Sequence, residues 1–222
     1  MKKLTVAVPA GRLRADALRA LRSAGYAGAA DPDDRSLLLP WGELTVLVAK
    51  PVDLLTYVER GAADCGIVGK DVLLEQSHHV YELLDLGFGR CRGVVAVPRG
   101  RTALWDDARR PLRIATKYPR VAEGFFRERG RPVEIVEMYG SVELAPRVGL
   151  SDGILDVVMT GATLRANDLV EVAQAFVSTA RLVVNPVSLR ARSDAVQTLL
   201  DRLRGRSGGA AIASASQGEG SA

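Results

Sequence analysis

"LTVLVAKPVDLLTYVERGAADCGIVG", residues 44–69, has the pattern of a strand, a helix and a second strand. Residues 44–49 and 65–69 are short apolar runs, and residues 51–61 between them have helical spacing. Pro51 suits the first turn of that helix, and Gly61 suits the position just after its end. A strand, a helix and a strand in this order predict a βαβ unit with parallel strands.

The same alternation extends in both directions and then starts again. Residues 4–9 precede a helical pattern over 14–25, and another helical pattern covers 70–76. After a strand in 92–100, the second series has strands at 112–116, 133–137 and within 152–160, with helices at 118–130 and 141–149 and a short one beginning near 163. We therefore expect an α/β protein of two lobes with largely parallel sheets.

The C-terminal part of the chain is expected to complete the first lobe. Residues 169–186 are interpreted as extended, and an apolar stripe over 189–204 predicts a terminal helix. These patterns place lobe I at 1–92 plus 182–205 and lobe II at 93–181. Residues 206–222 are rich in Gly, Ser and Ala and are expected to be a flexible tail.

Composition narrows the class of function. The 222 residues are 47% hydrophobic, and 30 basic against 26 acidic side chains are spread along the chain, which favours a phosphorylated small molecule over nucleic acid as the ligand. No run approaches the roughly 18 apolar residues that span a bilayer, and no membrane partner is expected. Cys65 and Cys91 lack metal-site spacing, so we expect reduced thiols in a cytoplasmic protein.

Residues 152–164, "DGILDVVMTGATL", combine a buried strand, an acidic residue and a glycine turn before a short helix. Unpaired backbone N–H groups at such a turn bind phosphate, and Thr160 and Thr163 add hydroxyl donors. Asp156 can accept hydrogen bonds from vicinal ribose hydroxyls, so the pattern indicates a phosphoribosyl site. The alternative is that the turn only redirects the chain and Asp156 only ends a strand.

Four stretches in order resemble the ATP phosphoribosyltransferase family, which catalyses the first step of histidine biosynthesis. They are "VAVPAGRL" (6–13), "AKPVDLLTYVERGAADCGIVGKDVL" (49–73), "LRIATKYP" (112–119) and "YGSVELAPRVGLSDGILDVVMTGATLRANDL" (139–169). The last resembles the family's phosphoribosyl-pyrophosphate signature. One departure is Ala10, where many members have lysine.

The resemblance implies the fold, reaction and partners. It implies two lobes like those of the periplasmic-binding-protein type II fold, with the active site in the interlobe cleft. The reaction transfers 5-phosphoribosyl from phosphoribosyl pyrophosphate to N1 of ATP, releases pyrophosphate and requires Mg²⁺. The chain's length resembles the short form, which needs a regulatory subunit similar to histidyl-tRNA synthetase, four catalytic with four partner chains, and is nearly inactive alone.

The resemblance also assigns site residues. The 5-phosphate would be held by Thr160, Gly161, Ala162, Thr163 and Leu164. The ribose would contact Asp156, Glu143 and Asp152. Pyrophosphate or ATP would contact Gly11, Arg12, Lys50 and Lys117, with Arg12 compensating for Ala10. Magnesium would be held by the substrate phosphates rather than by protein ligands, and no strong general base is expected.

Several residues have a second interpretation. Glu143 could only stabilise the first turn of a helix, and Asp152 could only be a turn residue. Lys70 and Asp71 could face the cleft or could start a helix. Four others are expected to be surface or packing residues, namely His78, His79, Trp41 and Trp105.

Three other functions fit parts of the pattern. A solute-binding module would share the bilobal fold, but an export signal is not visible. A phosphoribosyltransferase of the purine-salvage type would have two adjacent acidic residues before its loop, whereas Asp156 is followed by Val157. A relative that only binds nucleotides to regulate a partner would keep the motif without turnover.

Overall fold

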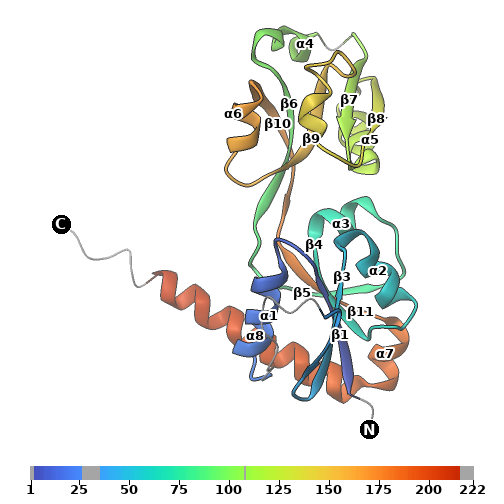
Figure 1. Cartoon of the computed structure of the whole chain (residues 1–222), viewed down its shortest axis with the longest axis vertical. Coiled ribbons are helices and arrows are strands. Elements are labelled where there is room, and N and C mark those ends of the chain that lie inside the picture. The colour runs from blue at the N-terminus through green and yellow to red at the C-terminus, as the bar shows by residue number, and fades with distance from the viewer. Residues whose placement is uncertain (1–2, 27–35, 108, 216–222) are drawn as a thin grey trace, which may run out of the picture. The chain divides into compact units, whose positions relative to one another are not determined.

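The structure is a computed structural model that describes residues 3–26, 36–107 and 109–215. It consists of two compact α/β units, as expected (Figure 1). Unit 1 comprises Met1–Val72, His78–Gly89 and Thr179–Ala222, and unit 2 comprises Leu73–Ser77 and Arg90–Ser178. Apart from Leu73–Ser77, the chain passes from unit 1 to unit 2 at residue 90 and returns at residue 179, rather than at 93 and 182. Unit 2 includes the whole of the strand that begins at Cys91 and the whole of the strand that ends at Ser178.

Unit 1 is built on a six-stranded sheet in the order β2-β3-β1-β4-β11-β5. Its strands are β1 (Leu4–Pro9), β2 (Leu38–Trp41), β3 (Leu44–Ala49), β4 (Cys65–Gly69), β5 (Tyr81–Asp85) and β11 (Ala180–Val184). Its helices are α1 (Arg14–Ser23), α2 (Pro51–Glu59), α7 (Pro186–Ala191) and α8 (Ser193–Ala215), and α3 (Lys70–Glu75) begins there.

Helices cover both faces of the unit 1 sheet (Figure 1). Residues of α1 and α8, such as Leu21 and Leu199, share one apolar cluster with alternate residues of β1. The opposite face receives α2, which packs so closely that a Cβ on Gly66 would lie 2.8 Å from side-chain carbons of Leu54 and Val58. Close packing of this kind explains why a glycine occupies the middle of β4.

Unit 2 is built on a five-stranded sheet in the order β10-β6-β9-β7-β8. The strands are β6 (Cys91–Pro98), β7 (Leu112–Thr116), β8 (Val133–Glu137), β9 (Gly153–Val158) and β10 (Leu169–Ser178). The helical elements are η1 (Arg99–Arg101), α4 (Ala103–Asp106), α5 (Pro119–Glu128), η2 (Val142–Leu144) and α6 (Ala162–Ala166).

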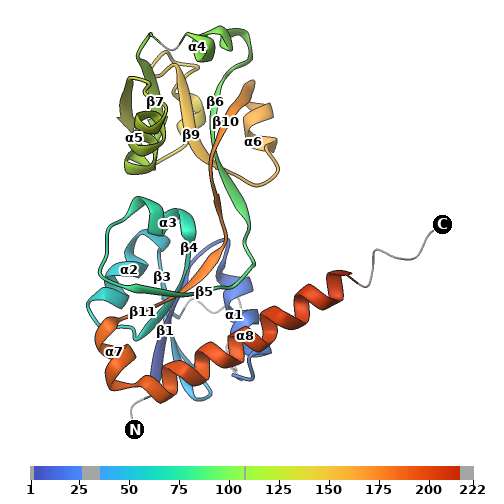
Figure 2. The ribbon, with the colours of Figure 1, turned by 180° about the vertical axis from the view of Figure 1, so that it is seen from behind.

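Adjacent residues of β9 face opposite sides of the unit 2 sheet. Leu155 packs with Phe126 of α5, whereas Ile154 shares a cluster with Val142 and with Leu164 of α6. Figure 2 accordingly shows α5 and α6 on opposite sides of the sheet. Strand β9 is therefore buried on both faces, as its apolar sequence indicates.

The expectation of largely parallel sheets was wrong. Among the described residues of unit 1 only the β1–β3 and β1–β4 pairs are parallel, and among those of unit 2 only β7–β8 and β7–β9 are. The long strands β6 and β10 run antiparallel to each other, and β11 runs antiparallel to both β4 and β5. Antiparallel pairing does not require a helical crossover, so the alternation of strands and helices along the chain does not by itself fix strand direction.

Two predicted helices were also wrong in extent. The segment 141–149 forms only the 3₁₀ turn η2, because Pro146 cannot supply a helical N–H and Gly149 has φ of 76°. The terminal helix is interrupted at Arg192 into α7 and α8, and α8 continues to Ala215 rather than ending before a tail at 206. Residues 216–222 of the predicted tail lie outside the described residues.

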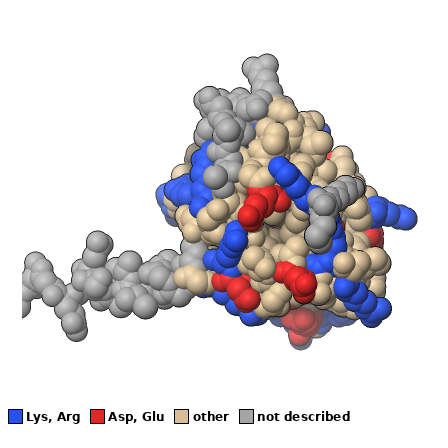
Figure 3. Space-filling view, turned by 90° about the horizontal axis from the view of Figure 1, so that it is seen from below, with Lys and Arg blue, Asp and Glu red and all other residues tan. Residues whose placement is uncertain are grey.

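Charged side chains of both signs intermix on the molecular face in Figure 3. Several pair with each other in unit 1, for example Arg202 with Glu43 at 3.3 Å and Arg181 with Asp85 at 3.0 Å. Among the described residues, no helix has the length and apolar character needed to cross a membrane.

Candidate functional site

The carboxyl ends of β7 and β9 bring two of the predicted site residues together. These neighbouring strands are parallel, so both end at the same edge of the unit 2 sheet. Lys117 directly follows β7, and its Nζ lies 3.6 Å from Oδ2 of Asp156 in β9. The Thr116 hydroxyl donates to the Leu155 carbonyl at 2.7 Å and accepts from the Tyr118 N–H at 2.9 Å, which fixes the backbone on either side of Lys117.

Asp156 is a buried carboxylate with few hydrogen bonds of its own. It is 9% exposed, and its Oδ1 accepts from the Val157 N–H at 2.8 Å. Burial raises the pKa of this carboxyl group, the positive charge of Lys117 opposes that rise, and the negative charge of Glu143 adds to it. Glu143 therefore belongs to the same electrostatic cluster as Asp156 and Lys117.

The turn after β9 exposes the groups that were expected to hold a phosphate. Gly161 has φ of 71°, a left-handed conformation that favours glycine, and it starts the short helix α6. Thr160, Ala162 and Thr163 are exposed. Their N–H and hydroxyl groups are available to an anion, apart from a 3.4 Å contact between the Ala162 N–H and Oγ1 of Thr160.

Leu164 has a different environment from the other four turn residues. Its side chain is 5% exposed and packs in the apolar cluster between α6 and the sheet. It can contribute a backbone N–H to an anion, and its side chain anchors the helix. Sequence reasoning missed Arg165, whose Nη1 donates to the Thr160 carbonyl at 3.0 Å and so braces the turn. The sequence signal that could have identified Arg165 is its position in the same short helix as Thr163.

Asp152 does not join this group. Its carboxylate, 2% exposed, accepts from the Arg113 N–H at 3.0 Å and from Nη2 of Arg113 at 3.2 Å, and Nη2 of Arg110 lies 3.6 Å away. Burial opposes ionisation, but these arginine contacts win and lower its pKa. Asp152 precedes β9 and lies about 13 Å along the strand from Asp156, so it holds structure and does not reach the turn.

Unit 1 brings together some of the residues that were predicted to contact pyrophosphate or ATP. Arg12 and the residue before Gly11 line a cavity of about 80 Å³ at the carboxyl ends of β1 and β4, where Asp71 is also buried. Gly11 has φ of 79°, and Nη1 of Arg12 donates to the Gly89 carbonyl at 3.2 Å. Lys50 is exposed at the start of α2, whose Pro51 follows it, and does not line this cavity.

The structure shows the surroundings of the residues that had two interpretations and of those expected to be surface or packing residues. Asp71 lines the unit 1 cavity, whereas Lys70 pairs with Glu82 at 2.6 Å. His78 lies 3.0 Å from Glu59, as a surface role predicts, and His79 is exposed. The packing roles of the tryptophans are confirmed, since Trp41 is fully buried and Trp105 packs on Phe126.

Reactive cysteines or metal ligands could supply chemistry outside the site described above. Both cysteines are buried and neither forms a disulfide, as expected for reduced thiols, and burial raises the pKa of Cys65 to about 12. The described ranges contain no group of three or more His, Cys, Asp or Glu side chains arranged to hold a metal ion.

Known proteins of one family match most of this chain. The family model for HisG, ATP phosphoribosyltransferase, matches residues 50–205. ATP phosphoribosyltransferase of Moorella thermoacetica is 49% identical over 216 residues, which cover 92% of this chain and 93% of that protein. The Bacillus licheniformis protein of the same name is 48% identical, covering 91% of this chain and 94% of that protein.

Solved structures support the same assignment. A chain of the ATP phosphoribosyl transferase (HisG:HisZ) complex from Thermotoga maritima is 34% identical and superposes with a TM-score of 0.77, covering 90% of this chain and 96% of that one. The alkanesulfonate-binding protein SsuA from Xanthomonas axonopodis, 14% identical with a TM-score of 0.56, shares only the periplasmic-binding-protein type of fold. The chain belongs to the ATP phosphoribosyltransferase family, enzymes of the pentosyltransferase class that catalyse the first step of histidine biosynthesis.

Proposed function

We propose that this chain transfers the 5-phosphoribosyl group of phosphoribosyl pyrophosphate to N1 of ATP and that unit 2 binds the phosphoribosyl group. The observation that carries the site assignment is the group at the carboxyl ends of β7 and β9. There a buried carboxylate lies 3.6 Å from an ammonium group, beside an exposed glycine turn. The turn binds the 5-phosphate through N–H and hydroxyl groups, and Asp156 accepts from the ribose diol.

Charge placement accounts for the chemistry. Breaking the bond from ribose C1 to pyrophosphate leaves positive charge on the sugar and negative charge on the leaving group. We assign Asp156 and Glu143, which interact electrostatically, to stabilise the sugar, and Lys117 to balance their charge until substrate binds. Adenine N1 already has a lone pair, so this mechanism needs no strong general base.

Unit 1 supplies cationic groups for the remaining phosphates. We assign Arg12, which lines the unit 1 cavity, its neighbour Gly11, and exposed Lys50 to pyrophosphate or the triphosphate of ATP. Ala10 lines the same cavity without a charge, so Arg12 carries the phosphate contact there. Mg²⁺ prefers oxygen ligands and commonly binds through substrate phosphates, and we assign it to the phosphates of the two substrates.

Thr163→Val is expected to raise KM for phosphoribosyl pyrophosphate about tenfold with a smaller change in kcat. The substitution keeps the shape of the side chain and removes one hydroxyl donor to a charged phosphate. Steady-state kinetics that follow the ultraviolet change of N1-ribosylated adenine measure this effect. Thr198→Val in α8 is the matched control, and an unchanged KM in Thr163→Val would remove the hydroxyl from the phosphate site.

We also propose a regulatory partner of the HisZ type, in a complex of four catalytic and four partner chains. The support for the partner, though not for the number of chains, is the HisG:HisZ complex in which the Thermotoga maritima relative was solved. The purified chain alone is expected to turn over at least about tenfold more slowly than with the partner. The same ultraviolet assay, with light scattering to measure complex mass, tests both statements. Full activity of a homogeneous chain alone would contradict the first.

A further inference from the structure

Unit 2 has a pocket at the end of its sheet opposite the glycine turn. This pocket of about 350 Å³ lies where β6 ends at Pro98 and β10 begins at Leu169, two residues that pair directly. Because Ala96 pairs with Ile154, the pocket lies beside the amino end of β9, whereas the glycine turn follows its carboxyl end. Its volume is within the range of small-molecule sites.

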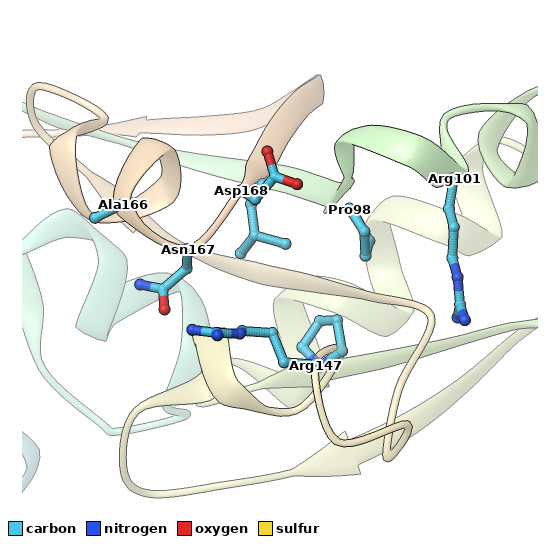
Figure 4. A pocket seen from close by; sticks show the side chains of 8 residues that line it. Pro98, Arg101, Arg147, Ala166, Asn167 and Asp168 are labelled. Carbon is cyan, nitrogen blue, oxygen red and sulfur yellow. The ribbon is translucent and has the colours of Figure 1, made fainter.

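Two arginines line this pocket without an ion pair to any described residue. Arg101 comes from η1, and Arg147 follows η2. Figure 4 shows their side chains on opposite sides of the pocket, with Arg147 extending toward Asn167. A guanidinium group binds carboxylate and phosphate through two parallel hydrogen bonds, so each arginine can hold one anionic group.

The acidic residue at the rim does not cancel this charge. Asp168 pairs with Nε of Arg99 at 3.2 Å, and its carboxylate points away from Arg101 and Arg147 (Figure 4). Counting Arg99, the pocket and its rim have three positive charges and one negative charge. The remaining walls include Pro98, Pro146 and Leu169, which offer an apolar surface for a carbon skeleton.

The pocket is also connected to the proposed phosphate turn. Nδ2 of Asn167, which lines the pocket, donates to the carbonyl of Thr163 at 3.0 Å. Arg147 lies four residues after Glu143 on the same short segment. A ligand that contacts Asn167 and Arg147 therefore touches both segments that carry proposed phosphoribosyl contacts.

We propose that this pocket binds a small organic anion with a carboxylate or phosphate group at each end, and that its occupancy changes the affinity for phosphoribosyl pyrophosphate. The coupling rests on the proposed function, whereas the binding does not. Linkage requires the effect to be reciprocal: phosphoribosyl pyrophosphate must change the affinity for the anion by the same factor.

Calorimetric titration of the full chain with 3-phosphoglycerate tests the binding. Saturating phosphoribosyl pyrophosphate and Mg²⁺, without ATP, block the first site, and glycerol is the uncharged control ligand. We expect millimolar or tighter binding that weakens at least about tenfold in Arg101→Gln/Arg147→Gln and is unchanged in Arg127→Gln, an exposed arginine of α5. No binding up to about 10 mM either with or without phosphoribosyl pyrophosphate, or equal binding in the double variant, would overturn the site.

Three further results separate the two proposals. Thr163→Val must keep 3-phosphoglycerate binding when the titration is repeated without phosphoribosyl pyrophosphate, because it alters only the first site. If the wild-type chain binds 3-phosphoglycerate but does not bind phosphoribosyl pyrophosphate, the proposed function fails while this pocket stands. If 3-phosphoglycerate binds and leaves that affinity unchanged in the wild-type chain, the coupling is overturned.

Discussion

Asp156→Asn is expected to lower kcat/KM for phosphoribosyl pyrophosphate about a hundredfold and to raise the melting temperature of the chain by about 2–4 °C. The loss of activity has a direct cause in the proposed site. A carboxylate that accepts from two ribose hydroxyls contributes charge-assisted hydrogen bonds, and a neutral amide weakens both of them. The amide also removes the negative charge opposite the developing positive charge of the sugar.

The gain in stability follows from the raised pKa of Asp156. Because its pKa is raised by burial, the folded state binds the proton more strongly than the unfolded state does. At a pH below the pKa of an ordinary aspartate, this carboxyl group is protonated in both the folded and the unfolded state, so its ionisation does not lower the stability of the folded state. As pH rises through the folded pKa, stability is lost, so the ionised group is unfavourable at neutral pH by about 1 kcal/mol.

Thermal unfolding at two pH values and steady-state kinetics test both halves of this expectation. The stabilisation by Asn should be present at pH 7 and should vanish near pH 3.5, where aspartate itself is protonated. Glu134→Gln, an exposed carboxylate of β8 in the same sheet, is the matched control and should change neither quantity. Near-normal kinetics in Asp156→Asn would remove this carboxylate from the ribose site.

Asp152→Asn, on the same segment, is expected to have the opposite profile. It should destabilise the chain by about 2 kcal/mol and leave kcat/KM of the folded enzyme within about twofold of wild type. Removing the charge leaves the Arg113 and Arg110 guanidinium groups without their buried partner. Both arginines are partly exposed, so solvent offsets part of that cost.

Melting temperature and kinetics well below it measure the two effects of Asp152→Asn. A loss of about 2 kcal/mol corresponds to a fall of about 4–8 °C for a chain of this size. The lowered pKa of Asp152 means that its stabilisation is present above the pKa of an unfolded aspartate and is lost as pH falls through the folded value. A selective rise in KM with no loss of stability would return Asp152 to the ribose site.

The sequence was sufficient for the α/β class and for most element positions in both units. Local signals explain this success: Pro51 and Gly61 mark the ends of α2, and the apolar residues on either side of Asp156 indicate that β9 is a strand buried on both faces. Strand direction was not predictable in the same way, because the pairing of β10 and β11 depends on contacts distant in sequence. Pro146 argues against a helix over 141–149, but the spacing of apolar residues there was given more weight and the helix was predicted.

The candidate site was only partly predictable for a related reason. Spacing identifies Asp156 and the glycine turn because they are neighbours in sequence. It cannot show that Lys117, from another strand, reaches Asp156, or that Asp152 is already engaged by Arg113. Two acidic residues of one short segment therefore received the same role from the sequence, and only tertiary contacts distinguish them.

A crystal structure of the full chain with phosphoribosyl pyrophosphate and Mg²⁺ tests the assigned site most directly. We expect the 5-phosphate within hydrogen-bonding distance of the N–H groups of residues 161–164, with both ribose hydroxyls on Asp156. A substrate bound elsewhere, with Asp156 still paired to Lys117 and the turn unoccupied, would contradict it.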